Sequence, residues 1–436
     1  LLRRLYHTTT RQPTMKEDFL HYLWRAKRFD LADLRTTQGE PVEILQWGEY
    51  NRHAGPDFQQ TRLRIGETLW AGSVEMHLRA SEWLRHRHQD DDAYRNVVLH
   101  VVLEEDVPVH RPDGDRLPCL ELRHRIAPRI QGAYLQLLHN QHWIPCQKQF
   151  HTVPEITRSL WLDRLAVERI QQRTGAVQLV LEQTNNNWEE TFYRLLARSF
   201  GVRVNTDPFE QLARSTPLLL LSKYKNNLFR LEALLFGQAG LLQQEFRDEY
   251  PKKLQREYRF LQQKHELRPM SPAQWKFLRM RPASFPSIRI AQLAALIYQS
   301  EHLFSKVLAA TNVAEVENMF AVKISHYWQD HYVFDKASAP KAKSLGRDAV
   351  HLLLINTIVP ILFYFGKQRG EIRYQDKALE LLDALEPEAN SIIENWRQLG
   401  VQPTSACETQ ALLQLKQQYC DQHRCLECAV GAAILK

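Results

Sequence analysis

The sequence predicts an α+β protein with a mixed sheet in its first third and an all-α region over the rest. Residues 41–47, 60–65 and 69–78 alternate polar and apolar side chains, with the period of two that strands have. Residues 97–103 form an almost wholly apolar run, which is typical of a strand covered on both faces. From residue 154 onward, apolar residues recur with the longer period of amphipathic helices.

Helices are expected before and between these strands. Residues 15–28 place Phe19, Leu23 and Trp24 near one helical face. Ser81 is a suitable N-cap for a helix that runs to about residue 94. The predicted order is therefore helix, three strands, helix, strand.

The helical region begins near residue 150. Its helices include residues 188–200, with Asn187 as the N-cap and Gly201 as the stop signal. We expect a basic extension over residues 1–14 and an α/β domain over 15–150. Residues 151–436 form either one large helical domain or two smaller ones.

Composition excludes several classes of protein. The chain has 436 residues, of which 44% are hydrophobic and 25% charged, as in folded soluble proteins. Its net charge of +7 is compatible with a polyanionic partner but does not establish one. Six cysteines in so long a chain do not indicate a disulfide framework, so a reducing cytoplasm is expected.

Neither a secretory signal nor a membrane span is predicted. Residues 1–14 are basic and contain no apolar run of signal-peptide length. The longest apolar run, residues 349–365, is interrupted by His351, Asn356 and Pro360. It is shorter than the roughly 20 apolar residues that a bilayer requires, and it is interpreted as a buried core helix.

Two carboxylates and a histidine mark the predicted sheet. Gly55-Pro56 forms a turn that places Asp57 at the entry to a strand. Glu75 and His77 share one face of the next strand. Carboxylates from separate strands are typical ligands of Mg²⁺ or Mn²⁺, which activates water against a phosphodiester. His77 is expected to position or deprotonate that water, or to ligate the metal.

A structural interpretation competes with this one. Asp57 also suits a simple turn, and Glu75 with His77 suits an exposed strand face. Nearby His86 and His88, with the acidic residues 90–92, form either a second cluster or a solvated helix surface. The sequence favours the solvated surface.

Cysteines near the end of the chain have metal-ligand spacing. Cys420, Cys425 and Cys428 form a C-x4-C-x2-C pattern, and Cys146 is the expected fourth ligand. Four thiolates suit either Zn²⁺ or a [4Fe-4S] cluster. The competing interpretation is that these cysteines are buried small side chains without a metal.

A basic and aromatic stretch lies within the helical region. Lys276, Arg279, Arg281 and Arg289 alternate with tryptophan and phenylalanine, a combination that can neutralise phosphates and stack bases. These four residues are the predicted nucleic-acid contacts. A loop packed on the core, with its arginines paired to acids, is the alternative.

With these motifs in place, the N-terminal part resembles the PD-(D/E)xK nuclease superfamily. The resemblance rests on the αβββαβ order, on the GPD before the second strand and on the E-x-H of the third. It implies catalytic roles for Asp57, Glu75 and His77, with Glu17 or Glu43 as an additional acid, and we select Glu17. The superfamily has lysine where this chain has His77, and this departure bears on activity.

Two further resemblances concern the whole chain and its cysteines. MKEDFLHYLW, NRHAGPDF, WAGSVEMHL and YCDQHRCLECAVG resemble an uncharacterised bacterial family known as a domain of unknown function. The cysteine pattern is similar to that of CRISPR-associated and recombination nucleases, in which such residues hold an iron-sulfur cluster. In those proteins the lone cysteine precedes the nuclease motifs, whereas Cys146 follows them.

The sequence thus predicts a metal-dependent nuclease, or a nuclease-derived DNA-binding protein, in the cytoplasm. The alternative is a non-catalytic interaction scaffold with a structural metal on its cysteines. A hydrolase of small phosphorylated substrates is a third interpretation.

Overall fold

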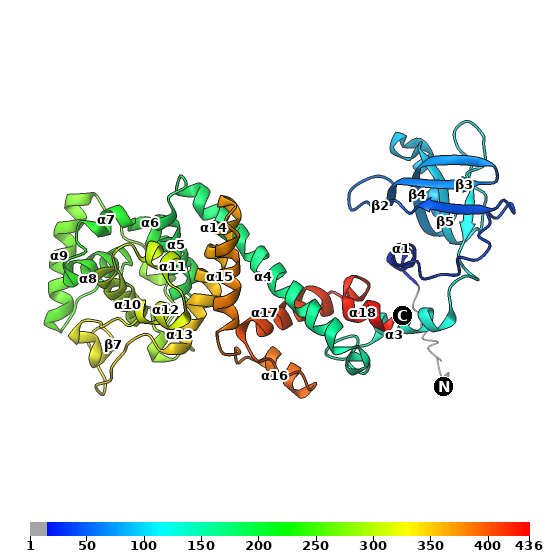
Figure 1. Cartoon of the computed structure of the whole chain (residues 1–436). Coiled ribbons are helices and arrows are strands. Elements are labelled where there is room, and N and C mark those ends of the chain that lie inside the picture. The colour runs from blue at the N-terminus through cyan, green and yellow to red at the C-terminus, as the bar shows by residue number, and fades with distance from the viewer. Residues whose placement is uncertain (1–14) are drawn as a thin grey trace, which may run out of the picture. The chain divides into compact units, whose positions relative to one another are not determined.

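The computed structural model describes residues 15–436, so the extension expected over residues 1–14 lies outside the described residues. The chain divides into two compact units (Figure 1). Unit 1 comprises residues up to Trp161 together with Leu415–Lys436, and unit 2 comprises Leu162–Gln414. Sequence reasoning assigns the last 22 residues to the helical region. Contacts place them in unit 1 instead, because the segment Cys425–Glu427 packs against the first helix.

Unit 1 is built on a mixed sheet with the strand order β1-β3-β4-β5-β6, and β2 pairs with β3. The pairs β1–β3 and β3–β4 are antiparallel, whereas β4–β5 and β5–β6 are parallel. The mixed sheet and the α+β class are as predicted. The strands are β1 (Val42–Gln46), β2 (Glu49–Tyr50), β3 (Phe58–Ile65), β4 (Thr68–Arg79), β5 (Val97–Glu104) and β6 (Cys119–Glu121).

The helices of unit 1 are short. Contacts from α1 and α2 reach β4. They comprise α1 (Glu17–Ala26), α2 (Glu82–Arg85), η1 (His88–Asp90), η2 (Asp92–Tyr94), α3 (Pro128–His139), η3 (Phe150–Thr152), η8 (Leu415–Cys420), η9 (Cys425–Glu427) and α18 (Ala429–Ile434).

The prediction of one helix from Ser81 to about residue 94 is wrong. This segment instead consists of the short helices α2, η1 and η2, because Arg87 adopts a left-handed conformation with φ of 60°. Ser81 makes no capping hydrogen bond to this helix, and its hydroxyl donates to Asp106 Oδ2 over 2.7 Å. This break directs His86 and His88 away from a regular helical path.

Unit 2 is helical apart from a small hairpin of β7 (His331–Val333) and β8 (Lys336–Ala337). The long helix α4 (Glu155–Gln183) begins in unit 1 and continues into unit 2. The other α-helices are α5 (Trp188–Phe200), α6 (Thr206–Ser215), α7 (Leu218–Ser222), α8 (Leu228–Gln238), α9 (Glu249–His265), α10 (Pro286–Gln299), α11 (Leu303–Ala309), α12 (Val313–Met319), α13 (Arg347–Leu353), α14 (Val359–Arg369), α15 (Ile372–Asp383), α16 (Ser391–Gln398) and α17 (Ala406–Gln414). Single turns occur at η4 (Pro272–Gln274), η5 (Pro282–Ser284), η6 (His326–Gln329) and η7 (Leu354–Ile358).

The start of α5 confirms a sequence prediction. The side chain of Asn187 accepts a hydrogen bond from the backbone N–H of Glu190 over 3.1 Å, and Gly201 is the C-cap. Such a cap contributes about 1 kcal/mol, because it pairs a backbone donor that the helix leaves free.

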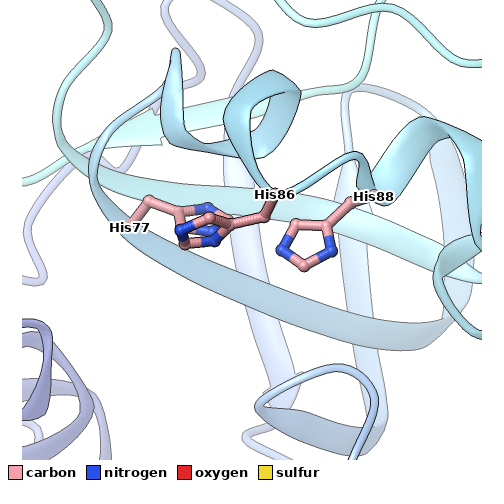
Figure 2. Close-up of side chains that lie close together, drawn as sticks. All are labelled: His77, His86 and His88. Carbon is pink, nitrogen blue, oxygen red and sulfur yellow. The ribbon is translucent and has the colours of Figure 1, made fainter.

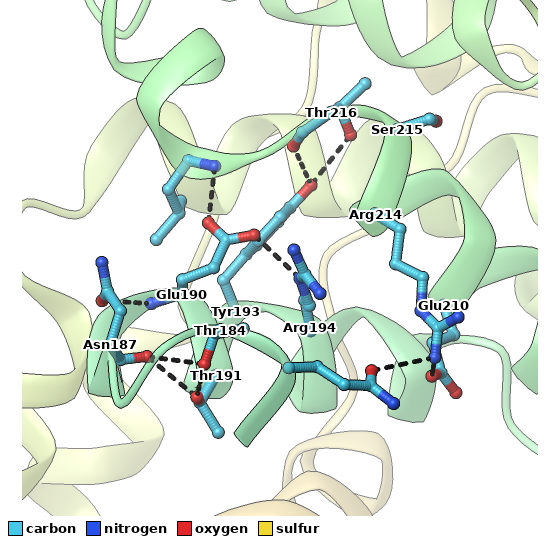
Figure 3. Close-up of polar contacts among 12 residues, drawn as sticks. Thr184, Asn187, Glu190, Thr191, Tyr193, Arg194, Glu210, Arg214, Ser215 and Thr216 are labelled. Atoms are coloured by element: carbon cyan, nitrogen blue, oxygen red, sulfur yellow. Dashed lines mark hydrogen bonds and ion pairs between the residues drawn. The ribbon is translucent and has the colours of Figure 1, made fainter. Parts of the chain in front are cut away.

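Buried polar groups in unit 2 pair closely with one another (Figure 3). Glu190 accepts from Arg194 Nε and from the backbone N–H of Leu218, both over 2.9 Å. The hydroxyl of Tyr193 donates to the carbonyl of Thr216 over 3.0 Å. This network joins α5 to the segment between α6 and α7, and it serves the packing of unit 2.

One continuous helical stretch, Arg347–Arg369, is long and apolar enough to cross a membrane. In its most apolar window, 72% is buried inside the protein. The turn η7 precedes Pro360 within this stretch, where a widened π-turn accommodates a residue without an N–H. Its burial agrees with the prediction of a buried core helix.

Candidate metal centre

Asp57, which immediately precedes β3, lies against Glu75 of β4. The backbone N–H of Asp57 donates to Glu75 Oε2 over 3.1 Å, and that of Met76 donates to Asp57 Oδ2 over 3.0 Å. Glu75 is 6% exposed, on the half of β4 that is buried on both faces. The strand face predicted to point away from the core is therefore covered.

The carboxylates of this centre repel one another. Burial and the charge of Asp57 raise the pKa of Glu75 to about 9. The same two causes raise the pKa of Glu17, in the first turn of α1, to about 7. Buried acids that repel one another favour protonation or a bound cation.

Glu17, rather than Glu43, belongs to this centre. Its Oε1 lies 4.0 Å from His77 Nε2. Glu43 instead forms an exposed ion pair with Arg64 over 2.7 Å. Sequence reasoning chose Glu17 between these two, and the structure brings it to Glu75.

His21 is a member of the centre that sequence reasoning missed. It lies one helical turn after Glu17 on α1, and its Nε2 is 3.2 Å from Asp57 Oδ2. Burial acts to lower the pKa of His21, but its hydrogen bond with Asp57 and the nearby negative charges raise it above the usual value. The i, i+4 spacing from Glu17 is the signal that could have identified it.

Histidines surround the other side of Glu75. Oε1 of Glu75 lies 3.7 Å from His77 Nε2 and 3.5 Å from His88 Nε2. Ligand atoms of His77, His86 and His88 all lie within 4.8 Å of one another (Figure 2). His86 and His88, interpreted from the sequence as part of a solvated surface, thus converge on the candidate centre.

His77 is held by another buried histidine. Its Nδ1 lies 2.9 Å from His100 Nε2, and His100 is fully buried. Burial and the neighbouring imidazoles lower the pKa of His77 to about 2, and burial lowers that of His100 to about 3. A neutral imidazole with so low a pKa is a weak base and suits a metal ligand better. Sequence reasoning missed His100 because it lies in an apolar strand. Only the register of β4 and β5, which pairs His100 with Glu75, identifies it as part of the site.

The four predicted cysteine ligands all belong to unit 1. Cys146, Cys420 and Cys428 are buried, Cys425 is partly buried, and all four are free thiols. Burial, and then the negative charges that Cys428 and Cys425 would carry when ionised, raise the pKa of Cys146 to about 12. Burial also raises the pKa of Cys425 to about 12, with Cys428 contributing. The thiols therefore lie close enough to oppose one another's ionisation, which a bound cation would relieve.

The chain packs tightly beside these cysteines. A Cβ atom added at Gly431 would lie 2.1 Å from the carbonyl oxygen of Cys425. Glycine is therefore required for α18 to approach η9. The two remaining cysteines lie elsewhere, Cys119 on β6 and Cys407 in unit 2.

A cavity of about 440 Å³ lies between α1 and η9, and we call it the α1–η9 cavity. His21 lines it at one point and Cys425 at another. Its basic and aromatic lining includes Lys16, Arg25, Arg52, His423, Arg424, Tyr22, Tyr50 and Tyr134. Asp18 and Glu427 also line it, so its charge is mixed.

The predicted nucleic-acid contacts lie in unit 2. Lys276, Arg279 and Arg281 are exposed in the loop before α10. Arg289 is partly buried on α10, where it donates to Gln292 over 3.1 Å, and burial lowers its pKa. Three of the four side chains are thus available to solvent, and Arg289 is engaged within the fold.

Comparisons with known proteins give one match. Neither the curated proteins nor the solved structures contain a match to this chain. A family model described as a protein of unknown function (DUF2851) matches residues 17–391. The matched range includes the candidate metal centre and Cys146, and it ends before Cys420. The chain belongs to this DUF2851 family.

Proposed function

We propose that this protein is a metal-dependent nuclease of the PD-(D/E)xK type, which hydrolyses phosphodiester bonds in DNA. The observation that carries the proposal is the crowding of Glu17, Asp57 and Glu75. Within the described residues, their ion pairs are with histidines alone. Oxygen ligands without a lysine or arginine partner suit Mg²⁺ or Mn²⁺.

The path of the chain supports this proposal. A helix precedes the antiparallel strands β1, β3 and β4, with the two-residue strand β2 paired to β3, and β4 is parallel to β5. Asp57 immediately precedes β3 and Glu75 lies within β4, so the acids come from two neighbouring strands. This order of elements agrees with the αβββαβ core that the sequence resemblance implies.

Individual residues have distinct proposed roles. When bound by Asp57 and Glu75, Mg²⁺ or Mn²⁺ would supply an activated water and neutralise charge on the phosphate. Glu17 would complete the acidic side of the centre. His77, in the position of the superfamily's lysine, remains uncharged, and His21 beside Asp57 is the group whose raised pKa favours a positive charge.

The α1–η9 cavity is the proposed entry for the nucleic acid. Arg25 stacks over Tyr50 at 4.9 Å, and Tyr50 contacts His21 of the centre. Basic side chains with tyrosines suit a strand whose phosphates are neutralised and whose bases stack. The exposed loop with Lys276, Arg279 and Arg281 is a second proposed contact, in unit 2.

The decisive experiment is Mn²⁺-dependent digestion of single- and double-stranded DNA by the purified chain. We expect Asp57→Asn and Glu75→Gln to abolish digestion while circular dichroism remains unchanged. Glu43→Gln is the matched control, because this acid is exposed and paired with Arg64. Digestion that survives in both variants of the centre would refute the proposal.

A non-catalytic scaffold is the second candidate, and the cysteines are the observation that favours it. We propose that Cys146, Cys420, Cys425 and Cys428 bind Zn²⁺ or a [4Fe-4S] cluster, which would fasten the end of the chain to unit 1. Free buried thiols in this number also agree with the proposed cytoplasmic location.

Metal analysis and an absorption spectrum of protein purified without oxygen test the cysteine site. Iron with sulfide would identify the cluster, and equimolar zinc that is lost in Cys425→Ser would identify the tetrahedral thiolate site. A scaffold would show no digestion, and its behaviour toward DNA would not depend steeply on salt. A nuclease that tracks phosphates would release counterions and lose affinity as salt rises.

A further inference from the structure

We propose that His77, His86 and His88, together with Glu75, form a second cation site that binds a divalent transition metal of the Zn²⁺ or Fe²⁺ class. This site adjoins the oxygen-ligand site proposed at Asp57 and shares Glu75 with it. The inference concerns metal binding alone, and it stands whether or not the chain cleaves DNA.

Three imidazole rings converge from two segments of unit 1. Ring centroids of His77, His86 and His88 are 5.2, 5.3 and 5.4 Å apart, so they form a nearly equilateral triangle. Their ligand atoms lie within 4.8 Å of one another. Small rotations would bring them to the spacing that a single ion with bonds of about 2.0–2.1 Å to nitrogen requires.

The backbone directs two of these rings to the same place. His86 is the C-cap of α2, and His88 begins η1. Between them, Arg87 has φ of 60°, a left-handed conformation that residues with a side chain adopt infrequently. His88 is further held by stacking on Tyr94, with ring centroids 3.8 Å apart.

Hydrogen bonding leaves nitrogen atoms available at this site. His77 uses Nδ1 toward His100, so its Nε2 is the atom that faces Glu75. The Nε2 of His88 is buried and has no hydrogen-bond partner among the described residues. A buried polar atom without a hydrogen-bond partner destabilises the fold, and a cation would supply the missing partner.

The contact between His77 and His100 also orients the site. If His77 coordinates through Nε2, its Nδ1 must carry the proton and donate to His100. Metal-binding histidines commonly donate their second N–H in this way, and such partners change metal affinity by about 10–100-fold. His100 is therefore a positioning residue for this site.

The donor set selects the kind of metal. Imidazole nitrogens suit zinc, iron and nickel, whereas Mg²⁺ prefers oxygen ligands and water. Glu75 directs Oε2 toward the N–H of Asp57 and Oε1 toward the histidines, so it faces both sites. Arg85 Nη2 lies 3.4 Å from His86 Nε2, which leaves Nδ1 as the free ligand atom of His86.

A titration with Co²⁺ tests this inference, because its spectrum separates the histidine site from the cysteines. Cobalt on nitrogen and oxygen gives weak visible bands, and cobalt on thiolates adds a strong near-ultraviolet band. We expect the wild-type chain and Cys425→Ser to show the weak bands, and His86→Ala/His88→Ala to lose them. The affinity for that ion should fall by more than about 100-fold, because two ligands are removed rather than one outer partner.

The controls keep the test decisive. His53→Ala/His124→Ala removes two exposed histidines elsewhere in unit 1 and should leave the titration unchanged. His86→Ala alone, which alters an exposed side chain, replaces the double variant if that variant does not fold. Unchanged stoichiometry and bands in a folded variant, or displacement of cobalt by a tenfold excess of Mg²⁺, would overturn the inference. Neither outcome depends on whether DNA is digested.

Discussion

Two buried polar clusters, one around Glu75 in unit 1 and one around Glu190 in unit 2, satisfy their hydrogen bonds to different degrees. Glu190 pairs with a guanidinium and a backbone N–H. Around Glu75, the negative charges of neighbouring carboxylates oppose its ionisation, and the Nε2 of His88 has no hydrogen-bond partner among the described residues. Networks that are fully satisfied stabilise a fold, whereas groups left unpaired indicate a ligand. The difference agrees with a packing role for the network of unit 2 and supports the binding role that we propose for the cluster of unit 1.

A third buried acid, Glu232 in unit 2, refines this comparison. Its pH-dependent contribution to the free energy of unfolding is the largest effect that we expect. Glu232 is fully buried on α8, where Tyr250 donates to its Oε2 and Ser325 Oγ lies 3.1 Å from the same oxygen. Burial nevertheless raises its pKa to about 7. Here a proton, rather than a metal, relieves the buried charge.

The pH dependence of stability follows from the sign of this shift. The folded state holds the proton of Glu232 more tightly than the unfolded state, whose ordinary value is 4.5. Its stabilising contribution is complete below pH 4.5 and is lost as the pH rises to about 7, by roughly 3 kcal/mol. Urea unfolding of Glu232→Gln should show a flatter pH profile in this window. An unchanged profile would contradict the assignment.

Added cation should stabilise unit 1 and leave unit 2 unchanged. At 100 times its dissociation constant, a ligand that binds only the folded state contributes about 2.7 kcal/mol. Thermal unfolding with Mn²⁺ should therefore shift upward in the wild type and not in Asp57→Asn. Glu190→Gln should retain the shift, because it lies outside the centre. A shift that persists in Asp57→Asn would indicate that the stabilising cation binds at another site.

Isosteric replacement of the two acids should differ in its effect on stability. Glu190→Gln removes the charge that Arg194 pairs with, and we expect a loss of about 2 kcal/mol. Glu75→Gln resembles the protonated acid that the raised pKa already favours, so its stability should change by less than about 1 kcal/mol. Chemical denaturation without metal measures both. Equal losses would remove the distinction between the clusters.

The smallest expected effect concerns Tyr193. Tyr193→Phe removes the hydroxyl that donates to Thr216, at a cost of about 1 kcal/mol. Chemical denaturation of the purified variant measures this loss, with Tyr298→Phe as an exposed control. No loss would indicate that the carbonyl of Thr216 finds another donor.

Local patterns in the sequence determined much of this protein. Alternation over residues 60–65 and 69–78 predicted strands that became β3 and β4, and the cap at Asn187 predicted the start of α5. Asp57 and Glu75 were selected because turn residues and strand periodicity depend only on neighbouring residues. Glu17 was selected through the superfamily resemblance alone.

Tertiary structure decided the remainder of the candidate centre. His21 meets Asp57 across the packing of α1, and His100 meets His77 through the parallel register of β4 and β5. The left-handed backbone conformation of Arg87 breaks the helix that the sequence predicted, and this break positions His86 and His88. These contacts join residues that are distant in the chain, and they depend on register and packing rather than on any local period.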